Sequence, residues 1–180
     1  MLTIQRTLLI AGCFIFCFAT FGMLYQEAIM VMLFTLLIPG PTLGLIIAFF
    51  KKASIVQRLT FFLTACAVYI LTLYIIDLKN IDYKLSPLRI LLASTICAVL
   101  LQIFFDIIFK TKINFKDTFV RPAIFGLFAS ILTTIAAFFF KVAPTTGWLT
   151  VPLWLGLFSI FPLWFYLFGR QLVLTGKVYS

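Results

Sequence analysis

Residues 88–109 read LRILLASTICAVLLQIFFDIIF, an almost unbroken apolar run of 22 residues. A helix needs about 20 apolar residues to cross the hydrocarbon core of a membrane, so this run is long enough to span. Its residues are continuously apolar and do not alternate with polar ones, as the strands of a membrane barrel would. The run therefore predicts a transmembrane helix.

Five further apolar runs of similar length flank this one. They cover residues 7–25, 28–50, 55–76, 122–140 and 147–169. Of the whole chain, 64% is hydrophobic and only 11% is charged, whereas soluble domains carry about 25% charged residues. The links between the runs hold about a dozen residues at most, which is too few to fold alone. The sequence predicts an all-α fold: a single transmembrane domain over residues 1–180, built as a bundle of six helices.

The charged residues lie at the ends of the apolar runs and predict the orientation of the chain. Ten of the 14 Lys and Arg residues fall on one side of the predicted topology, namely Arg6, Lys51, Lys52, Arg58, Lys110, Lys112, Lys116, Arg121, Arg170 and Lys177. The remaining four, Lys79, Lys84, Arg89 and Lys141, fall on the other side. Because cytoplasmic loops carry the excess of Lys and Arg, we expect both termini in the cytoplasm of a bacterial inner membrane. The Lys and Arg residues that produce the net charge of +9 are then expected to contact lipid headgroups. Nucleic acid is not an expected partner.

The residue types that are missing limit the chemistry. Histidine is absent, which excludes haem ligation by His, His-containing metal sites and Ser-His-Asp catalysis. The cysteines all lie within apolar runs, where a thiol behaves as a small hydrophobe; they are Cys13, Cys17, Cys66 and Cys97. We expect no metal, no cofactor and no catalytic residue.

The second run contains Pro39, Gly40 and Pro41, which predict a kink or break in its helix. A broken membrane helix frees backbone groups that can bind a ligand. The alternative, which we favour, is a kink that neighbouring helices accommodate. Gly40, Gly44 and Ala48 follow at four-residue spacing and predict a face on which another helix packs closely.

Polar residues in the run 88–109 recur on one helical face. Ser94, Ala98, Gln102 and Asp106 are spaced by four residues, so this face should point into the bundle. An acid inside a membrane span is a functional candidate, and Gln102 is placed to orient Asp106. A structural ion pair with Lys110, one turn further along the same helix, is the alternative that we favour.

Trp154 completes the set of candidate ligand-binding residues. It lies deep in the last run, where it could stack on a ligand, although a lipid-facing position is the more ordinary reading. The candidates are therefore Pro39, Gly40, Pro41, Gln102, Asp106 and Trp154.

These features predict a component that binds or transports a small molecule or lipid, without catalytic activity of its own. Its expected partners are membrane lipids and, as part of a larger transporter, another membrane protein subunit. One alternative is an interaction protein, such as an immunity or assembly factor that binds other membrane helices. A membrane-lipid enzyme is a weaker alternative, since the chain offers few candidate general acids and bases.

Overall fold

The structure, a computed structural model, describes residues 2–25, 27, 34, 38–76, 86–142, 155–175 and 177. Every regular element among these residues is helical. The elements are α1 (Leu2–Leu24), α3 (Pro39–Phe50), α4 (Ile55–Ile76), α5 (Pro87–Ile108), the π-helical turn η2 (Lys116–Val120), α6 (Arg121–Val142) and α8 (Ile160–Leu174). The all-α prediction is confirmed for the described residues.

Within the described ranges, five helical stretches are long and apolar enough to cross a membrane. They are Thr3–Leu24, Ile55–Ile76, Pro87–Ile108, Lys116–Phe139 and Leu155–Leu174. Each of them overlaps one of the predicted apolar runs. The helices therefore support an integral membrane protein, as the sequence predicts.

The second predicted run, 28–50, is described as a helix only from Pro39 onward. Helix α3 has 12 residues and rises about 18 Å, which is less than the roughly 30 Å of hydrocarbon. The helix begins at a proline because backbone N–H groups in a first turn have no partner within the helix anyway. Phe34 stacks on Phe18 of α1 with ring centroids 4.8 Å apart, and most of the run before Ile38 lies outside the described residues. A sixth span stays a prediction.

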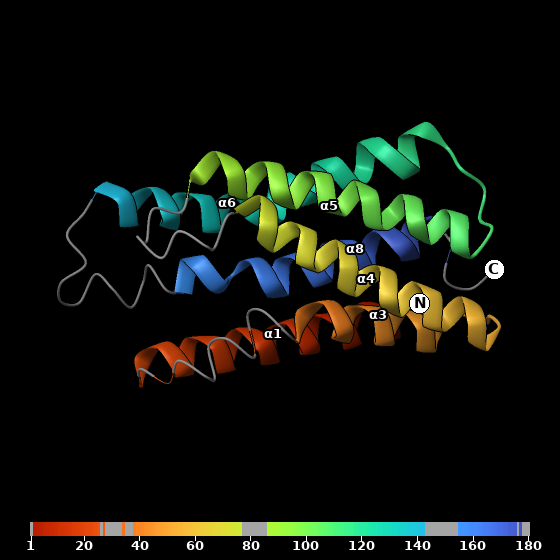
Figure 1. Ribbon diagram of the computed structural model, residues 1–180, viewed down its shortest axis with the longest axis horizontal. Coiled ribbons are helices and arrows are strands. Elements are labelled where there is room, and N and C mark those ends of the chain that lie inside the picture. Colours follow the sequence, from red (N-terminus) through yellow and green to blue (C-terminus); the bar gives the residue numbers. More distant parts are fainter. Residues whose placement is uncertain are drawn as a thin grey trace.

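The helices pack as a closed circuit around a shared core. In order, α1 contacts α3, α3 contacts α4, α4 contacts α5, α5 contacts α6, α6 contacts α8, and α8 returns to α1. Figure 1 shows these helices running side by side along the long axis of the molecule. The core between them is apolar and includes Leu8, Phe61, Leu101, Phe105 and Leu172.

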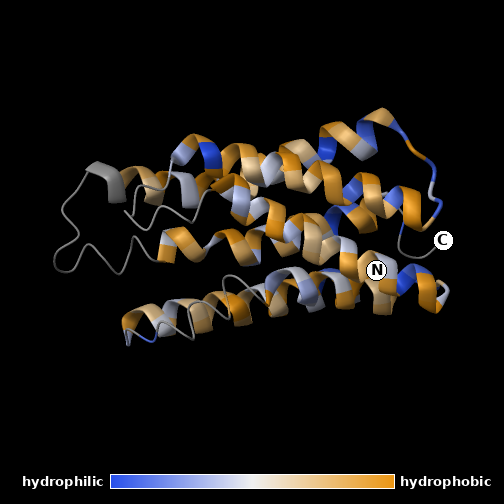
Figure 2. Cartoon of the chain, viewed as in Figure 1, coloured by the Kyte–Doolittle hydropathy of each residue, from blue (hydrophilic) through white to orange (hydrophobic). Residues whose placement is uncertain are grey.

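The outward surface of the bundle is also apolar, which a water-soluble helical protein would not tolerate. On α4, Ile55, Val56 and Ile70 are 82%, 72% and 64% exposed. Several polar residues are instead buried between the helices, among them Ser94 and Ser130. Figure 2 shows hydrophobic residues along the length of the helices and the strongest hydrophilic segments near their ends. Lipid is the surrounding medium that fits this distribution.

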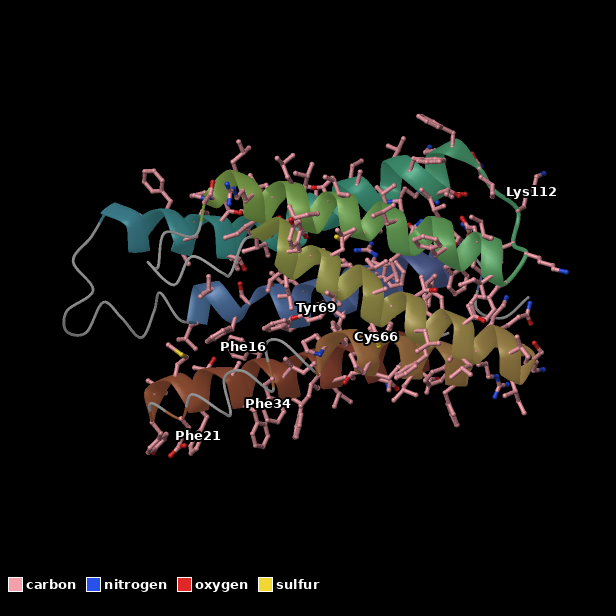
Figure 3. The ribbon with its side chains drawn as sticks, in the orientation of Figure 1. Phe16, Phe21, Phe34, Cys66, Tyr69 and Lys112 are labelled. Atoms are coloured by element: carbon pink, nitrogen blue, oxygen red, sulfur yellow. The ribbon has the colours of Figure 1, made fainter. Side chains whose placement is uncertain are left out.

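The start of α1, the end of α8 and two of the charged links lie at the same end of the bundle (Figure 1). These links join α3 to α4 and α5 to η2, and Lys112 in the second points away from the helices (Figure 3). The distribution of Lys and Arg predicts that all four segments lie on one side of the membrane. Their position at one end of the bundle agrees with this prediction. We call this end the charged end; its assignment to the cytoplasm stays a prediction.

The last helix differs from its predicted bounds. The apolar run predicts an end at Gly169, but α8 continues to Leu174, and Gln171 within this extension is fully buried. Just before this extension, α8 lies close to α1, since a Cβ added at Gly169 would lie 2.7 Å from Leu8 Cδ1. The extra turn brings the chain after α8 to the end of α5, where the candidate site lies.

Candidate functional site

Asp106 lies in the last turn of α5 with only 1% of its surface exposed. The residues that share its helical face, Ser94, Ala98 and Gln102, are also buried, so the predicted inward face is confirmed. A buried carboxylate is costly unless charged or polar partners surround it. The neighbours of Asp106 therefore determine what this face can do.

Four side chains from three parts of the chain donate to the Asp106 carboxylate. Lys177 Nζ lies 2.7 Å from Oδ1 and 2.8 Å from Oδ2. The Thr111 hydroxyl donates to Oδ1 at 2.5 Å and the Thr118 hydroxyl to Oδ2 at 2.6 Å. Gln102 Nε2 donates to Oδ1 at 3.1 Å. We call these five residues the Asp106 cluster.

The prediction that Asp106 pairs with Lys110 is wrong, because Asp106 forms its ion pair with Lys177. Helix α5 ends at Ile108, and Lys110 has a φ of 52°, in the left-handed region. Because this backbone is not helical, Lys110 does not lie on the same face as Asp106. Its side chain is exposed. The spacing rule on which the prediction rested applies only within an intact helix.

The way α5 ends also explains the position of Thr111. The Thr111 N–H donates to the Asp106 carbonyl at 2.9 Å, and the Lys110 N–H donates to the Ile107 carbonyl at 3.3 Å. These two bonds form the Schellman motif, which satisfies the last carbonyls of a helix through a left-handed residue. The turn folds Thr111 back over the end of the helix, beside the carboxylate.

Lys177 is brought to the cluster by the chain that follows α8. Its N–H donates to the Leu172 carbonyl at 3.2 Å, so the backbone turns back over the end of that helix. Its own carbonyl accepts a hydrogen bond from Lys51 Nζ, at the end of α3. Lys177 is 71 residues from Asp106 in sequence, beyond the predicted last span, and the spacing of residues could not pair them.

Two further side chains hold the charged end together. Gln171 Nε2 on α8 donates to the Asp117 carbonyl of η2 at 2.7 Å. Gln57 Nε2 on α4 donates to the Ile108 carbonyl at the end of α5 at 2.9 Å. Sequence reasoning missed both residues. Gln171 lies beyond the predicted last run, which ends at Gly169, and it follows Arg170, so hydropathy does not single it out.

Two amide oxygens at this end are buried without a hydrogen-bond partner in the part of the chain that is described. They are Oε1 of Gln102 and Oε1 of Gln171, on residues that are fully buried. An unpaired buried acceptor costs about 1–3 kcal/mol. Gln102 matters most for the site, because the other end of its amide already binds Asp106.

Pro39, Gly40 and Pro41 lie at the opposite end of α3 from Lys51, about 15 Å away along the helix, and are not brought to the Asp106 cluster. Gly40 packs instead on α4: a Cβ there would lie 2.8 Å from the Cβ of Tyr69, which is labelled in Figure 3. Gly44 is as close to Phe62 of α4, at 3.0 Å. These contacts agree with the predicted packing face.

Trp154 lies outside the described residues. A small hollow lies between α5, α6 and α8, lined by apolar side chains and by Gln171, with a volume of about 10 Å³. That is the space of about one water molecule. No group of three His, Cys, Asp or Glu residues that could hold a metal ion occurs within the described ranges.

The Asp106 cluster is therefore the candidate site, since it gathers a charge pair, two hydroxyls and an amide inside the bundle. Within the cluster, Lys177 Nζ contacts both oxygens of the Asp106 carboxylate. Comparison with protein-family models, curated proteins and solved structures finds no match to this chain.

Proposed function

We propose that this chain is a non-enzymatic membrane component that binds or transports a small molecule, with the Asp106 cluster as its binding site. The observation that supports the proposal is the buried pair of Asp106 and Lys177, 1% and 6% exposed, inside an otherwise apolar bundle. Removing two charges from water costs several kcal/mol per ion, and an apolar pair of the same size would often be as stable. Ionisable groups inside membrane spans more often mark a ligand pathway.

The same geometry argues against a catalytic role for Asp106. Its carboxylate already accepts five hydrogen bonds, from four side chains. A general acid or base must exchange a proton with a substrate at about 3 Å, and both oxygens of Asp106 are occupied by fixed donors. Binding of a charged group, in exchange for one of these donors, needs no proton transfer.

Native mass spectrometry of the full chain in lipid nanodiscs tests the proposed function. We expect the wild-type protein to retain a bound small molecule and the double variant Asp106→Asn/Lys177→Met to lose it. The double variant is chosen because it removes both charges together and leaves neither one buried alone. Retention of the same molecule by the double variant would refute the proposal. A membrane protein that copurifies in place of a small molecule would instead favour the interaction-protein alternative.

A further inference from the structure

Residues 110–120 connect the end of α5 to the start of α6, and we call them the α5–α6 segment. Its outward side chains combine positive charge with large apolar groups. Its three lysines are all exposed, namely Lys110, Lys112 and Lys116. Between them, Ile113 is 57% exposed and Phe115 is 73% exposed, and Lys112 points away from the helices (Figure 3). Lysine together with aromatic and aliphatic side chains is typical of segments that lie on a membrane surface.

The lengths of the neighbouring helices place this segment at the level of the lipid headgroups. Helix α5 has 22 residues and rises about 33 Å, and the stretch Lys116–Phe139 has 24 residues and rises about 36 Å. Each is as long as the hydrocarbon core, which is roughly 30 Å thick. The residues that join them therefore lie at the boundary, where apolar side chains can enter the acyl region while lysine ammonium groups stay in water.

The positive charge of the segment faces outward without an acidic partner among the described residues. Of the acidic side chains, Asp106 and Asp117 lie at the charged end. Asp106 pairs with Lys177 at 2.7 Å, and Asp117 pairs with Arg121 at 2.5 Å. Both acids are thus engaged, and the three lysines of the segment are left to face the medium.

An anionic phospholipid is the partner that fits both features of this surface. A soluble anion gives the exposed side chains of Ile113 and Phe115 no apolar surface to contact, and a neutral lipid gives the lysines no counter-charge. Each lysine near an anionic membrane surface strengthens the attraction by roughly fivefold. Burial of the apolar side chains at the acyl boundary adds to this attraction.

The inward side chains of the same segment hold the Asp106 carboxylate. The Thr111 hydroxyl donates to it at 2.5 Å and the Thr118 hydroxyl at 2.6 Å. Gln171 of α8 donates to the Asp117 carbonyl in the same segment at 2.7 Å. A lipid that holds the outward face in place therefore also holds the turn that covers Asp106.

We propose that the outward face of the α5–α6 segment binds anionic phospholipids of the leaflet at the charged end, and that the bound lipid stabilises the turn over Asp106. The inference does not depend on the proposed function, because the lysines and apolar side chains that it uses lie outside the Asp106 cluster.

The variant Lys110→Gln/Lys112→Gln/Lys116→Gln tests the lipid contact, because it removes the outward charge and keeps polar side chains of similar size. The thermal midpoint of the full chain is measured in nanodiscs of phosphatidylcholine and of phosphatidylglycerol. We expect wild type to be more stable in phosphatidylglycerol by roughly 5 °C, and the variant to lose most of this gain. High salt should reduce the gain of wild type, because exposed charges are screened.

The matched control is Arg6→Gln/Lys52→Gln/Arg170→Gln, which removes three exposed cations from the same end but outside the segment. It should keep most of the gain in phosphatidylglycerol. Soluble glycerol phosphate, added to phosphatidylcholine nanodiscs, should not reproduce the gain. The inference is overturned if wild type is equally stable in both lipids, if the two triple variants lose the gain equally, or if glycerol phosphate replaces the lipid.

Hydrogen exchange tests the effect on the turn over Asp106. The backbone amides in the last turn of α5 should exchange several-fold more slowly in phosphatidylglycerol than in phosphatidylcholine, because opening of this turn requires the segment to leave the lipid. The triple lysine variant should show no such difference between the two lipids. Equal exchange of wild type in both lipids would contradict the link between the lipid surface and the turn.

Discussion

At the scale of single residues, the identity of the Asp106 partner decides how the charged end is built. Two lysines compete for the role, Lys110 in the same helix and Lys177 after the last one. The structure pairs Asp106 with Lys177 at 2.7 Å and places Lys110 in a left-handed turn. The two arrangements predict opposite effects of changing Lys110.

Lys110→Gly should stabilise the protein by about 1 kcal/mol. A left-handed backbone costs a residue with a Cβ about 1–2 kcal/mol, and glycine avoids most of that cost. The change in the free energy of unfolding is measured in mixed micelles, as the fraction of denaturing detergent is increased. Lys110→Ala is the matched control and should be close to neutral, because alanine keeps the Cβ and loses only an exposed charge. Destabilisation of both variants by several kcal/mol would restore Lys110 as the partner of the buried acid.

Which residues reach Asp106 could be predicted only in part. The four-residue spacing of Gln102 and Asp106 is a local property of one helix, so the sequence is sufficient to place both on the inward face. The roles of Thr111 and Lys177 depend on how α5 and α8 end and on which helices become neighbours. Those are properties of the packed chain, and a hydrophobic pattern carries no information about them.

At the scale of elements, close helix packing depends on glycine. A Cβ added at Gly126 of α6 would lie 2.7 Å from the Ser94 carbonyl oxygen and 2.9 Å from Thr95 Cα, both on α5. The Ser94 hydroxyl donates to the Gly126 carbonyl at 2.7 Å across the same contact. Because the opposing atoms are mostly backbone, the two helices would have to separate to admit a side chain.

Gly126→Ala should therefore destabilise the bundle by about 1–3 kcal/mol, even though alanine favours a helix more than glycine does. The same micelle unfolding assay measures the loss. Ala67→Leu on α4 is a control, since Ala67 is exposed on the lipid-facing surface and added bulk there meets no neighbour. Equal stability of the Gly126 variant and wild type would show that α5 and α6 are not packed this closely.

The helices themselves were the most predictable part of the molecule. Hydropathy over about 20 residues predicted the five long helices, with ends within a few residues except at α8 and at the start of α1, which begins at Leu2 and not at Thr7. At α8 the predicted run ends at Gly169, before Arg170 and Gln171, yet Gln171 turns inward and donates to η2. A polar residue near a helix end has the same hydropathy whether it faces water or a buried partner.

At the scale of the whole molecule, the two described links at the charged end are expected to share one side of the membrane. Cysteine placed singly at Lys52 or Lys112, in a chain whose four native cysteines are replaced, should react with a membrane-impermeant maleimide only after cells are opened. Both residues are exposed and lie in links between helices. A cysteine at Glu27, beyond the other end of α1, should react in intact cells. Reaction of position 112 in intact cells would reverse the predicted orientation.

The pairing of Asp106 with Lys177 joins the end of α5 to the chain that follows α8, and so closes the charged end of the bundle. A double-mutant cycle with Asp106→Asn and Lys177→Met measures this closure, with unfolding in mixed micelles as the readout. Each single variant should lose about 3–5 kcal/mol, because it leaves one charge buried and unpaired. The double variant should lose less than the sum, with a coupling energy of about 2–3 kcal/mol. A coupling energy near zero, or a larger one when Lys110→Met replaces Lys177→Met in the cycle, would contradict the account.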